Sequence, residues 1–274
     1  MKKLIFFTDI DGTLLDYFTY SFEAALPALR LLKEKNISLI ICSSKTRKEI
    51  EYYRKKLDNH HPFISENGGG IFIPKGYFEF RVWSSEFGVT DENNYYVIRL
   101  GAKYSDLRKV IEELREEGVK VKGFGNMTVE EISRLAGLGI DEALMAKERY
   151  FDEPFIYSGE IQDLPLLLQS IKEKGYNFTQ GRFFHILGNS DKGKAVSILI
   201  ELYKRKFGEV VTIAIGDSPN DIPMLEKVDK PIIVQKPGSN YEPKIVVHGL
   251  IKTDGIGPEG WNKAVIKIIR DNID

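Results

Sequence analysis

Two carboxylates near the start of the chain, Asp9 and Asp11, lie two residues apart and are followed by Gly12. They come directly after the apolar run 4–7, whose composition is typical of a strand buried on both faces of a parallel sheet. Ligands of open α/β sheets bind at the carboxyl ends of the strands, so this position suits chemistry. Asp-Gly is also a common turn sequence, and the pair alone fits a plain turn equally well.

Three further polar clusters lie at the ends of apolar runs, and a lysine begins a later helix. The carboxyl ends of parallel strands share one edge of a sheet, so we expect these side chains to converge with Asp9 and Asp11. Separate turn residues would not all gather there. The residues are Ser43, after residues 37–42; Glu66 and Asn67, after residues 62–64; Asp217, Asn220 and Asp221, after residues 210–215; and the helix-starting Lys192.

Several carboxylates in one pocket repel one another and need a cation, and oxygen ligands without His or Cys favour Mg²⁺. A carboxylate is also a nucleophile toward phosphorus and would give an aspartyl phosphate. Phosphoryl transfer places charge on three oxygens, which Lys192, Ser43 and backbone N–H groups near Gly12 can compensate. Asp11 can protonate the leaving oxygen and then activate water. The residue types therefore predict magnesium-dependent phosphoryl transfer.

The elements that position these residues alternate between strand and helix patterns, which predicts an α/β fold with parallel strands and right-handed crossovers. The run 71–74 is expected to form a hairpin arm beside the glycine turn 68–70. Residues 235–257 look loop-rich. The expected strands are 4–7, 37–42, 62–64, 210–215 and 231–234, and the expected helices are 22–35, 47–57, 191–207, 222–227 and 261–269.

The segment between these two parts has a different character and predicts an inserted α+β module. We expect the core to comprise residues 1–84 and 188–274, and the module residues 85–187. Strands are predicted at 95–100, 119–122, 155–157, 177–180 and 183–187, the last two as a pair turning at Gly181-Arg182, and helices at 103–117, 128–135, 141–148 and 164–174.

The bulk composition excludes several classes of protein. The formal net charge of −1 over 274 residues provides no broad basic field for nucleic acid or a membrane surface. The single cysteine, Cys42, rules out an internal disulfide and a Cys-based zinc site. No apolar stretch is long enough to span a bilayer, and no signal-peptide pattern precedes the first strand. We expect a cytoplasmic protein.

Four stretches that contain most of these residues resemble, in this order along the chain, the signature motifs of the haloacid dehalogenase (HAD) superfamily. That resemblance implies a Rossmann-like parallel-sheet core with an inserted cap domain of type IIB. The motifs are Asp9-Ile10-Asp11-Gly12-Thr13, Ser43, Lys192-Gly193 and Gly216-Asp217-Ser218-Pro219-Asn220-Asp221.

The same resemblance implies a role for each motif residue. Asp9 would be the nucleophile and Asp11 the general acid and base. Mg²⁺ would be held by the Asp9 side chain, the Asp11 carbonyl and Asp217, with Asp221 supporting the metal site. The residues that would hold the phosphate are Ser43, Lys192 and Asn220.

Shorter stretches resemble mannosyl-3-phosphoglycerate phosphatases within that superfamily. The implied reaction is hydrolysis of mannosyl-3-phosphoglycerate to phosphate and mannosylglycerate, a compatible solute. The stretches are Ser44-Lys45-Thr46-Arg47, residues 62–70, Glu148-Arg149-Tyr150, Gly181-Arg182-Phe183 and residues 257–260.

Such a small-molecule substrate carries a phosphate, a carboxylate and a sugar. Arg182, at a predicted hairpin tip, suits a two-pronged contact with the carboxylate, although a solvated turn arginine is the alternative. Glu66 and Asn67 suit sugar hydroxyls. The other residues predicted to bind the substrate are Gly12, Ser44, Lys45 and Gly68. For Lys45, the alternative is a surface charge at the start of a helix. We interpret His185 as a strand residue.

Other functions use related residues. A receiver-type signalling domain also has a phosphorylated Asp, but the large insertion has no place in one. A phosphomutase would use the same residues and return the phosphoryl group to the sugar. Asp11 argues against dehalogenation, which needs no such acid. The sequence leaves open whether the substrate is a mannosyl compound, a glucosyl compound or sugar phosphates in general. It also leaves the oligomeric state open.

Overall fold

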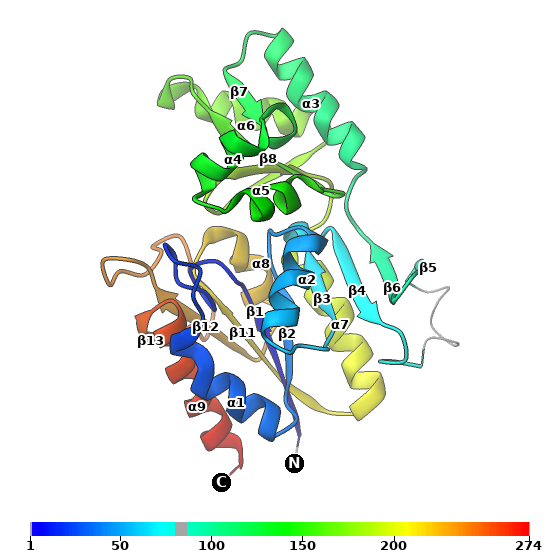
Figure 1. The fold of residues 1–274 in the computed structure, drawn as a ribbon, viewed down its shortest axis with the longest axis vertical. Coiled ribbons are helices and arrows are strands. Elements are labelled where there is room, and N and C mark those ends of the chain that lie inside the picture. The colour runs from blue at the N-terminus through cyan, green and yellow to red at the C-terminus, as the bar shows by residue number, and fades with distance from the viewer. Residues whose placement is uncertain (1, 80–86, 274) are drawn as a thin grey trace.

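The computed structural model describes residues 2–79 and 87–273 and contains a large and a small β-sheet (Figure 1). The expected core boundary, between residues 84 and 85, lies outside these described residues. The large sheet has nine strands in the order β13 (Ile251–Ile256), β12 (Lys230–Gln235), β11 (Val210–Gly216), β1 (Lys3–Thr8), β2 (Ser38–Cys42), β3 (Phe63–Ser65), β4 (Gly70–Pro74), β6 (Tyr95–Arg99) and β5 (Val89–Glu92).

Strand β1 lies in the middle of this sheet and runs parallel to both neighbours. Thr8 at its end pairs with Ile215 of β11 and with Ile41 of β2, so the three strands end level with one another. The residues that follow these strands therefore emerge at one edge. The predicted α/β fold with parallel strands is confirmed, and β3 and β4 form the predicted antiparallel hairpin.

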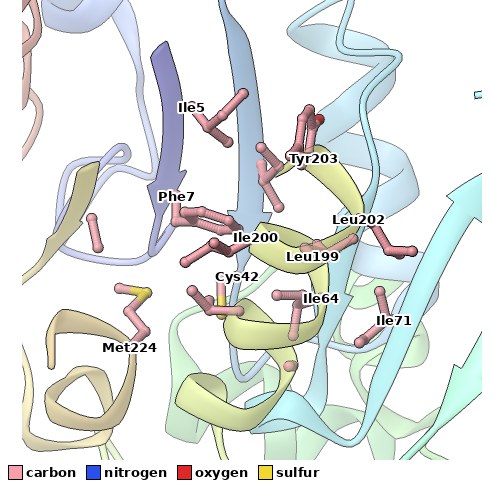
Figure 2. Close-up of a cluster of buried hydrophobic side chains, with 14 of the residues drawn as sticks. Ile5, Phe7, Cys42, Ile64, Ile71, Leu199, Ile200, Leu202, Tyr203 and Met224 are labelled. Carbon is pink, nitrogen blue, oxygen red and sulfur yellow. The ribbon is translucent and has the colours of Figure 1, made fainter. Parts of the chain in front are cut away.

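Helices cover both faces of β1 because its side chains alternate between them. Ile5 and Phe7 pack in a buried cluster with α7, as Figure 2 shows. Leu4 and Phe6 lie in a second cluster with α1 and α9. The helices on the large sheet are α1 (Leu26–Glu34), α2 (Arg47–Lys56), α7 (Lys192–Phe207), α8 (Ile222–Leu225) and α9 (Pro258–Ile273).

The small sheet belongs to a module that lies above the large sheet in Figure 1. Its strands are all antiparallel, in the order β7 (Val121–Gly123), β8 (Asp152–Tyr157), β10 (Phe184–Leu187) and β9 (Asn177–Gln180). The β9–β10 pair is the predicted hairpin. The helices of the module are α3 (Tyr104–Glu116), α4 (Val129–Ala136), α5 (Ile140–Lys147) and α6 (Leu164–Glu173). The first and last of these share a buried cluster with the sheet.

Two sequence expectations differ from the structure. The strand that we expected inside the insertion, β6, pairs with β4 and so extends the large sheet. The stretch expected to be loop-rich contains β13, which pairs with β12. β13 has polar residues at exposed positions, such as Lys252 and Asp254, so it lacks the apolar run of a central strand. We therefore propose that the inserted module spans Gly101 to Leu187.

The described part of the chain contains no helix that is both long enough and apolar enough to cross a membrane.

Candidate active site

Three buried carboxylates meet at the edge of the large sheet where the parallel strands end. Asp9 follows β1, Asp217 follows β11, and Asp221 ends the short turn of 3-10 helix after it. One oxygen from each lies within 4.8 Å of the others. The structure therefore brings together the acids of the first and last motifs, as the parallel sheet predicts.

Lys192 lies among these acids and partly neutralises them. Its Nζ is 2.6 Å from Asp9 Oδ1 and 2.7 Å from Asp221 Oδ1, and its side chain is fully buried. Burial still raises the pKa of Asp9 well above its ordinary value, against the opposing charge of Lys192. Burial and the nearby Asp221 raise the pKa of Asp217 to about 6. Three acids against this lysine leave uncompensated negative charge, so the oxygen donors fit a hard divalent cation.

Asp221 is held on both of its oxygens. Oδ1 accepts from Lys192, and Oδ2 accepts from the backbone N–H groups of Asp217 and Ser218, each at 3.0 Å. Asp217 in turn accepts from the hydroxyl of Thr13 at 3.0 Å and from that of Ser218 at 2.8 Å. Asp221 thus orients the loop that carries Asp217, and the acids have fixed positions.

Gly68 fixes the start of α7 and hence Lys192. It has a φ of +91°, and a Cβ added to it would lie 2.1 Å from the carbonyl oxygen of Asp191. Asp191 caps α7 by accepting from Lys194 N at 2.8 Å. The sequence predicts substrate contact for Gly68, but the structure places it against Asp191 and not on the cavity wall.

A cavity lies beside the acids, between the large sheet and the module. Asp11 and Lys45 line it from the large-sheet side, and Arg182, Phe183 and His185 line it from the module. Of the predicted site residues, those that line it are Asp9, Asp11, Ser44, Lys45, Arg182, Asp217 and Asn220, and those that do not are Gly12, Ser43, Glu66, Asn67, Gly68, Lys192 and Asp221.

Lys45 is buried beside Asp11, so the interpretation as a surface charge is wrong. Its Nζ lies 3.0 Å from Asp11 Oδ2 and 3.3 Å from Glu49 Oε1. Burial opposes its charge, but these carboxylates raise the pKa of Lys45 well above its ordinary value. Burial likewise raises the pKa of Asp11, and Lys45 limits the rise. Asp11 Oδ1 is buried and has no hydrogen-bond partner among residues 2–79 and 87–273.

Glu66 joins the large sheet to the module instead of facing the cavity. Its Oε2 accepts from the N–H groups of Tyr150, Phe151 and Asp152 at 2.9, 2.7 and 3.1 Å. Its side chain is fully buried, and burial raises its pKa to about 7. The predicted contact between Glu66 and sugar hydroxyls is therefore not available in this structure.

Arg182 lies at the predicted hairpin tip and is more than a solvated turn residue. Its Nη1 donates to the carbonyl of Ala136 at 2.7 Å and to the hydroxyl of Tyr20 at 3.0 Å. Tyr20 comes from the loop after β1, so this contact spans the cavity between the two parts of the protein.

Several residues that line the cavity were not predicted from the sequence. Tyr17 and Tyr20 lie in a turn with no recognisable motif. Arg149 pairs with Asp152 and donates to the carbonyl of Ser44 at 2.7 Å. Arg149 stood in a stretch that resembled known phosphatases, which was the available indication of a role.

These features define a class: an α/β protein with a buried acidic site, suited to a divalent cation and to phosphoryl chemistry, beneath an inserted α+β module. A family model described as haloacid dehalogenase-like hydrolase matches residues 6–121 and 161–239. The chain belongs to this family of HAD hydrolases, which confirms the resemblance drawn from the motifs.

Curated relatives match most of the chain. A protein of Methanococcoides burtonii named glucosyl-3-phosphoglycerate/mannosyl-3-phosphoglycerate phosphatase is 48% identical over 98% of both chains. A mannosyl-3-phosphoglycerate phosphatase of Pyrococcus horikoshii is 44% identical over 85% of this chain and 91% of its own. Among solved structures, the sucrose-phosphatase of Synechocystis superimposes on this protein with a TM-score of 0.65 at 14% sequence identity. The comparison covers 98% of this chain and 99% of that chain, so the two proteins share the fold.

We predict that Gly68→Ala destabilises the protein more than Gly118→Ala. Both glycines have a left-handed φ, of +91° and +85°, but Gly118 has open space around its Cβ position. The control should lose about 1–2 kcal/mol, and Gly68→Ala a further 1–3 kcal/mol or more, since alanine would displace the start of α7. Chemical denaturation measures both losses. Equal losses would contradict the packing role of Gly68.

Proposed function

We propose that this protein is a Mg²⁺-dependent phosphatase that hydrolyses mannosyl-3-phosphoglycerate to mannosylglycerate and phosphate. The observation that carries the proposal is the buried cluster of Asp9, Asp217 and Asp221 around Lys192, at the strand ends beside a cavity. The names of the curated relatives support the substrate. The single buried cysteine, Cys42, fits a reducing compartment, and we place the reaction in the cytoplasm.

Asp9 is the nucleophile in this account. Its carboxylate attacks phosphorus, the bond to the sugar-glycerate oxygen breaks, and an aspartyl phosphate forms. Lys192, at 2.6 Å, favours the ionised form of Asp9 that the attack needs. Mg²⁺ held by Asp9, Asp217 and the Asp11 carbonyl would compensate the negative charge of the phosphoryl oxygens and the acids, with Asp221 supporting the site.

Asp11 is the general acid and base. Its raised pKa favours a proton on the carboxyl group, ready for the leaving oxygen. Lys45 pairs with Oδ2 of Asp11 and so holds the carboxyl group in place where Asp11 lines the cavity. The carboxylate formed then accepts a proton from the water that hydrolyses the aspartyl phosphate.

Ser43, Lys192 and Asn220 are the residues we assign to the phosphate, with backbone N–H groups near Gly12. Asn220 lines the cavity and is held by a hydrogen bond from its Nδ2 to Asn67 Oδ1 at 3.0 Å. Asn67 therefore acts by orienting Asn220. Ser43 is buried and immediately precedes Ser44 and Lys45, which do line the cavity.

Arg182, Ser44 and Lys45 are the residues we assign to the glycerate carboxylate. Arg182 and Lys45 are cations that line the cavity from the module and from the large-sheet side, which suits an anionic group in addition to the phosphate. A second substrate is favoured by one specific observation: relatives at 48% and 43% identity carry glucosyl-3-phosphoglycerate as well as mannosyl-3-phosphoglycerate in their names. We therefore include the glucosyl compound as a second candidate.

A panel of phosphate esters tests the proposal. With Mg²⁺, the protein should release phosphate from mannosyl-3-phosphoglycerate with a higher kcat/KM than from mannose-6-phosphate or 3-phosphoglycerate, since these carry only part of the recognised group. Asp9→Asn is the matched control and should release none, because an amide is a poor nucleophile. Comparable rates on every ester would reduce the substrate to sugar phosphates in general. Turnover by Asp9→Asn would exclude Asp9 as the nucleophile.

We predict that Arg182→Ala raises KM about 10- to 100-fold for esters that carry a carboxylate, since it removes a charged hydrogen bond. The KM for mannose-6-phosphate, which has no carboxylate, should change much less. Arg134→Ala provides a control because that arginine is exposed in the last turn of the neighbouring helix α4 and does not line the cavity. The carboxylate contact is ruled out should Arg182→Ala weaken every ester to the same extent.

A further inference from the structure

His185 faces the cavity because of its place in strand β10. Ile186, the next residue, points into the buried cluster shared with α3 and α6. Side chains alternate along a strand, so His185 points to the opposite face of the small sheet, towards the large sheet. There it lines the cavity beside Arg182 and its cross-strand partner Pro154, with only 4% of its surface exposed.

Asp152 sets the orientation of the imidazole ring. His185 Nδ1 lies 3.0 Å from Asp152 Oδ2, and Arg149 Nε donates to Asp152 Oδ1 at 2.7 Å. Burial favours the neutral acid, but Arg149 and His185 outweigh it and hold the pKa of Asp152 below its ordinary value. An ionised carboxylate only accepts hydrogen bonds, so Nδ1 carries a proton and donates it to the hydrogen bond with Asp152.

Nε2, the second nitrogen of the ring, takes no part in the contact with Asp152. A hydroxyl group can both donate and accept a hydrogen bond, so it is a suitable partner for Nε2. The structure gives Nε2 no hydrogen bond to the described residues, and the ring lies on the cavity wall. Apolar side chains of Phe124, Leu138 and Phe183 line the same cavity, which suits the C–H surface of a sugar ring.

The same carboxylate reaches the phosphate end of the cavity. Asp152 Oδ2 also accepts from Asn67 Nδ2 at 2.8 Å, and Asn67 Oδ1 accepts from Asn220 Nδ2 at 3.0 Å. Asp152 thus orients His185 on the module and, through Asn67, Asn220 beside the acids. The two ends of a bound substrate would be held by one connected set of hydrogen bonds.

We propose that His185 binds a hydroxyl group of the sugar part of the substrate through Nε2, and that Asp152 positions it. This inference rests on the proposed function, which supplies a sugar-bearing phosphate ester. It assigns sugar recognition to the module wall, at a position separate from the cations that would bind the glycerate carboxylate.

The test compares His185→Asn with the wild type. Asparagine keeps an amide N–H close to the Nδ1 position, so the contact with Asp152 is retained while Nε2 is lost. The ratio of kcat/KM for mannosyl-3-phosphoglycerate to that for 3-phosphoglycerate, which has no sugar, should fall about tenfold or more. His60→Asn, at an exposed histidine away from the cavity, should leave the ratio unchanged. An unchanged ratio in His185→Asn, whether kcat/KM stays the same for both esters or falls equally for both, would overturn the inference.

A binding measurement separates this inference from the proposed function. Calorimetry with mannosylglycerate, which carries the sugar and needs no turnover, should give a dissociation constant about tenfold weaker for folded His185→Asn than for the wild type. Equal affinities would overturn the role of His185. Failure of the wild type to hydrolyse any ester would instead overturn the proposed function.

Discussion

The buried ammonium group of Lys192, held between Asp9 and Asp221, is the interaction on which the rest of the site depends. Removing one partner of such a buried pair costs about 3–5 kcal/mol, because it leaves an uncompensated charge. The surrounding structure holds the pair in place: the glycine turn packs on the start of α7, and backbone N–H groups hold Asp221. The excess of carboxylates over this lysine makes the site a place for a divalent cation.

The module completes the site through a second buried set of charges. Glu66 accepts three backbone N–H groups at the start of β8, and the Arg149–Asp152 pair lies directly beside them. These contacts join the loop after β3 to the module and close the cavity over the acids. Because Asp152 also holds His185 and Asn67, module position and substrate recognition depend on the same residues.

The strand-end acids were predictable because a parallel sheet places residues that follow its strands at one edge, whatever their separation in sequence. The hydrogen-bond partners of Glu66 could not be predicted. The sequence around this carboxylate does not indicate that it binds backbone N–H groups 84 to 86 residues further along the chain. β13 was missed because its exposed face is polar, and β6 was assigned to the module because a strand pattern does not say which sheet it joins. His185 was predicted to be a strand residue, and it lies in strand β10. The face of the small sheet from which its side chain projects depends on how that sheet packs, which the sequence does not specify.

Mg²⁺ binding measured by calorimetry is the most direct test of the central claim that the acids around Lys192 form a cation site. The account predicts saturable binding to the wild type and about 10- to 100-fold weaker binding to Asp217→Asn, which removes one charge from the cluster. Asp254→Asn, at an exposed acid of β13, should bind like the wild type. No binding to the wild type, or equal binding to Asp217→Asn, would contradict the claim.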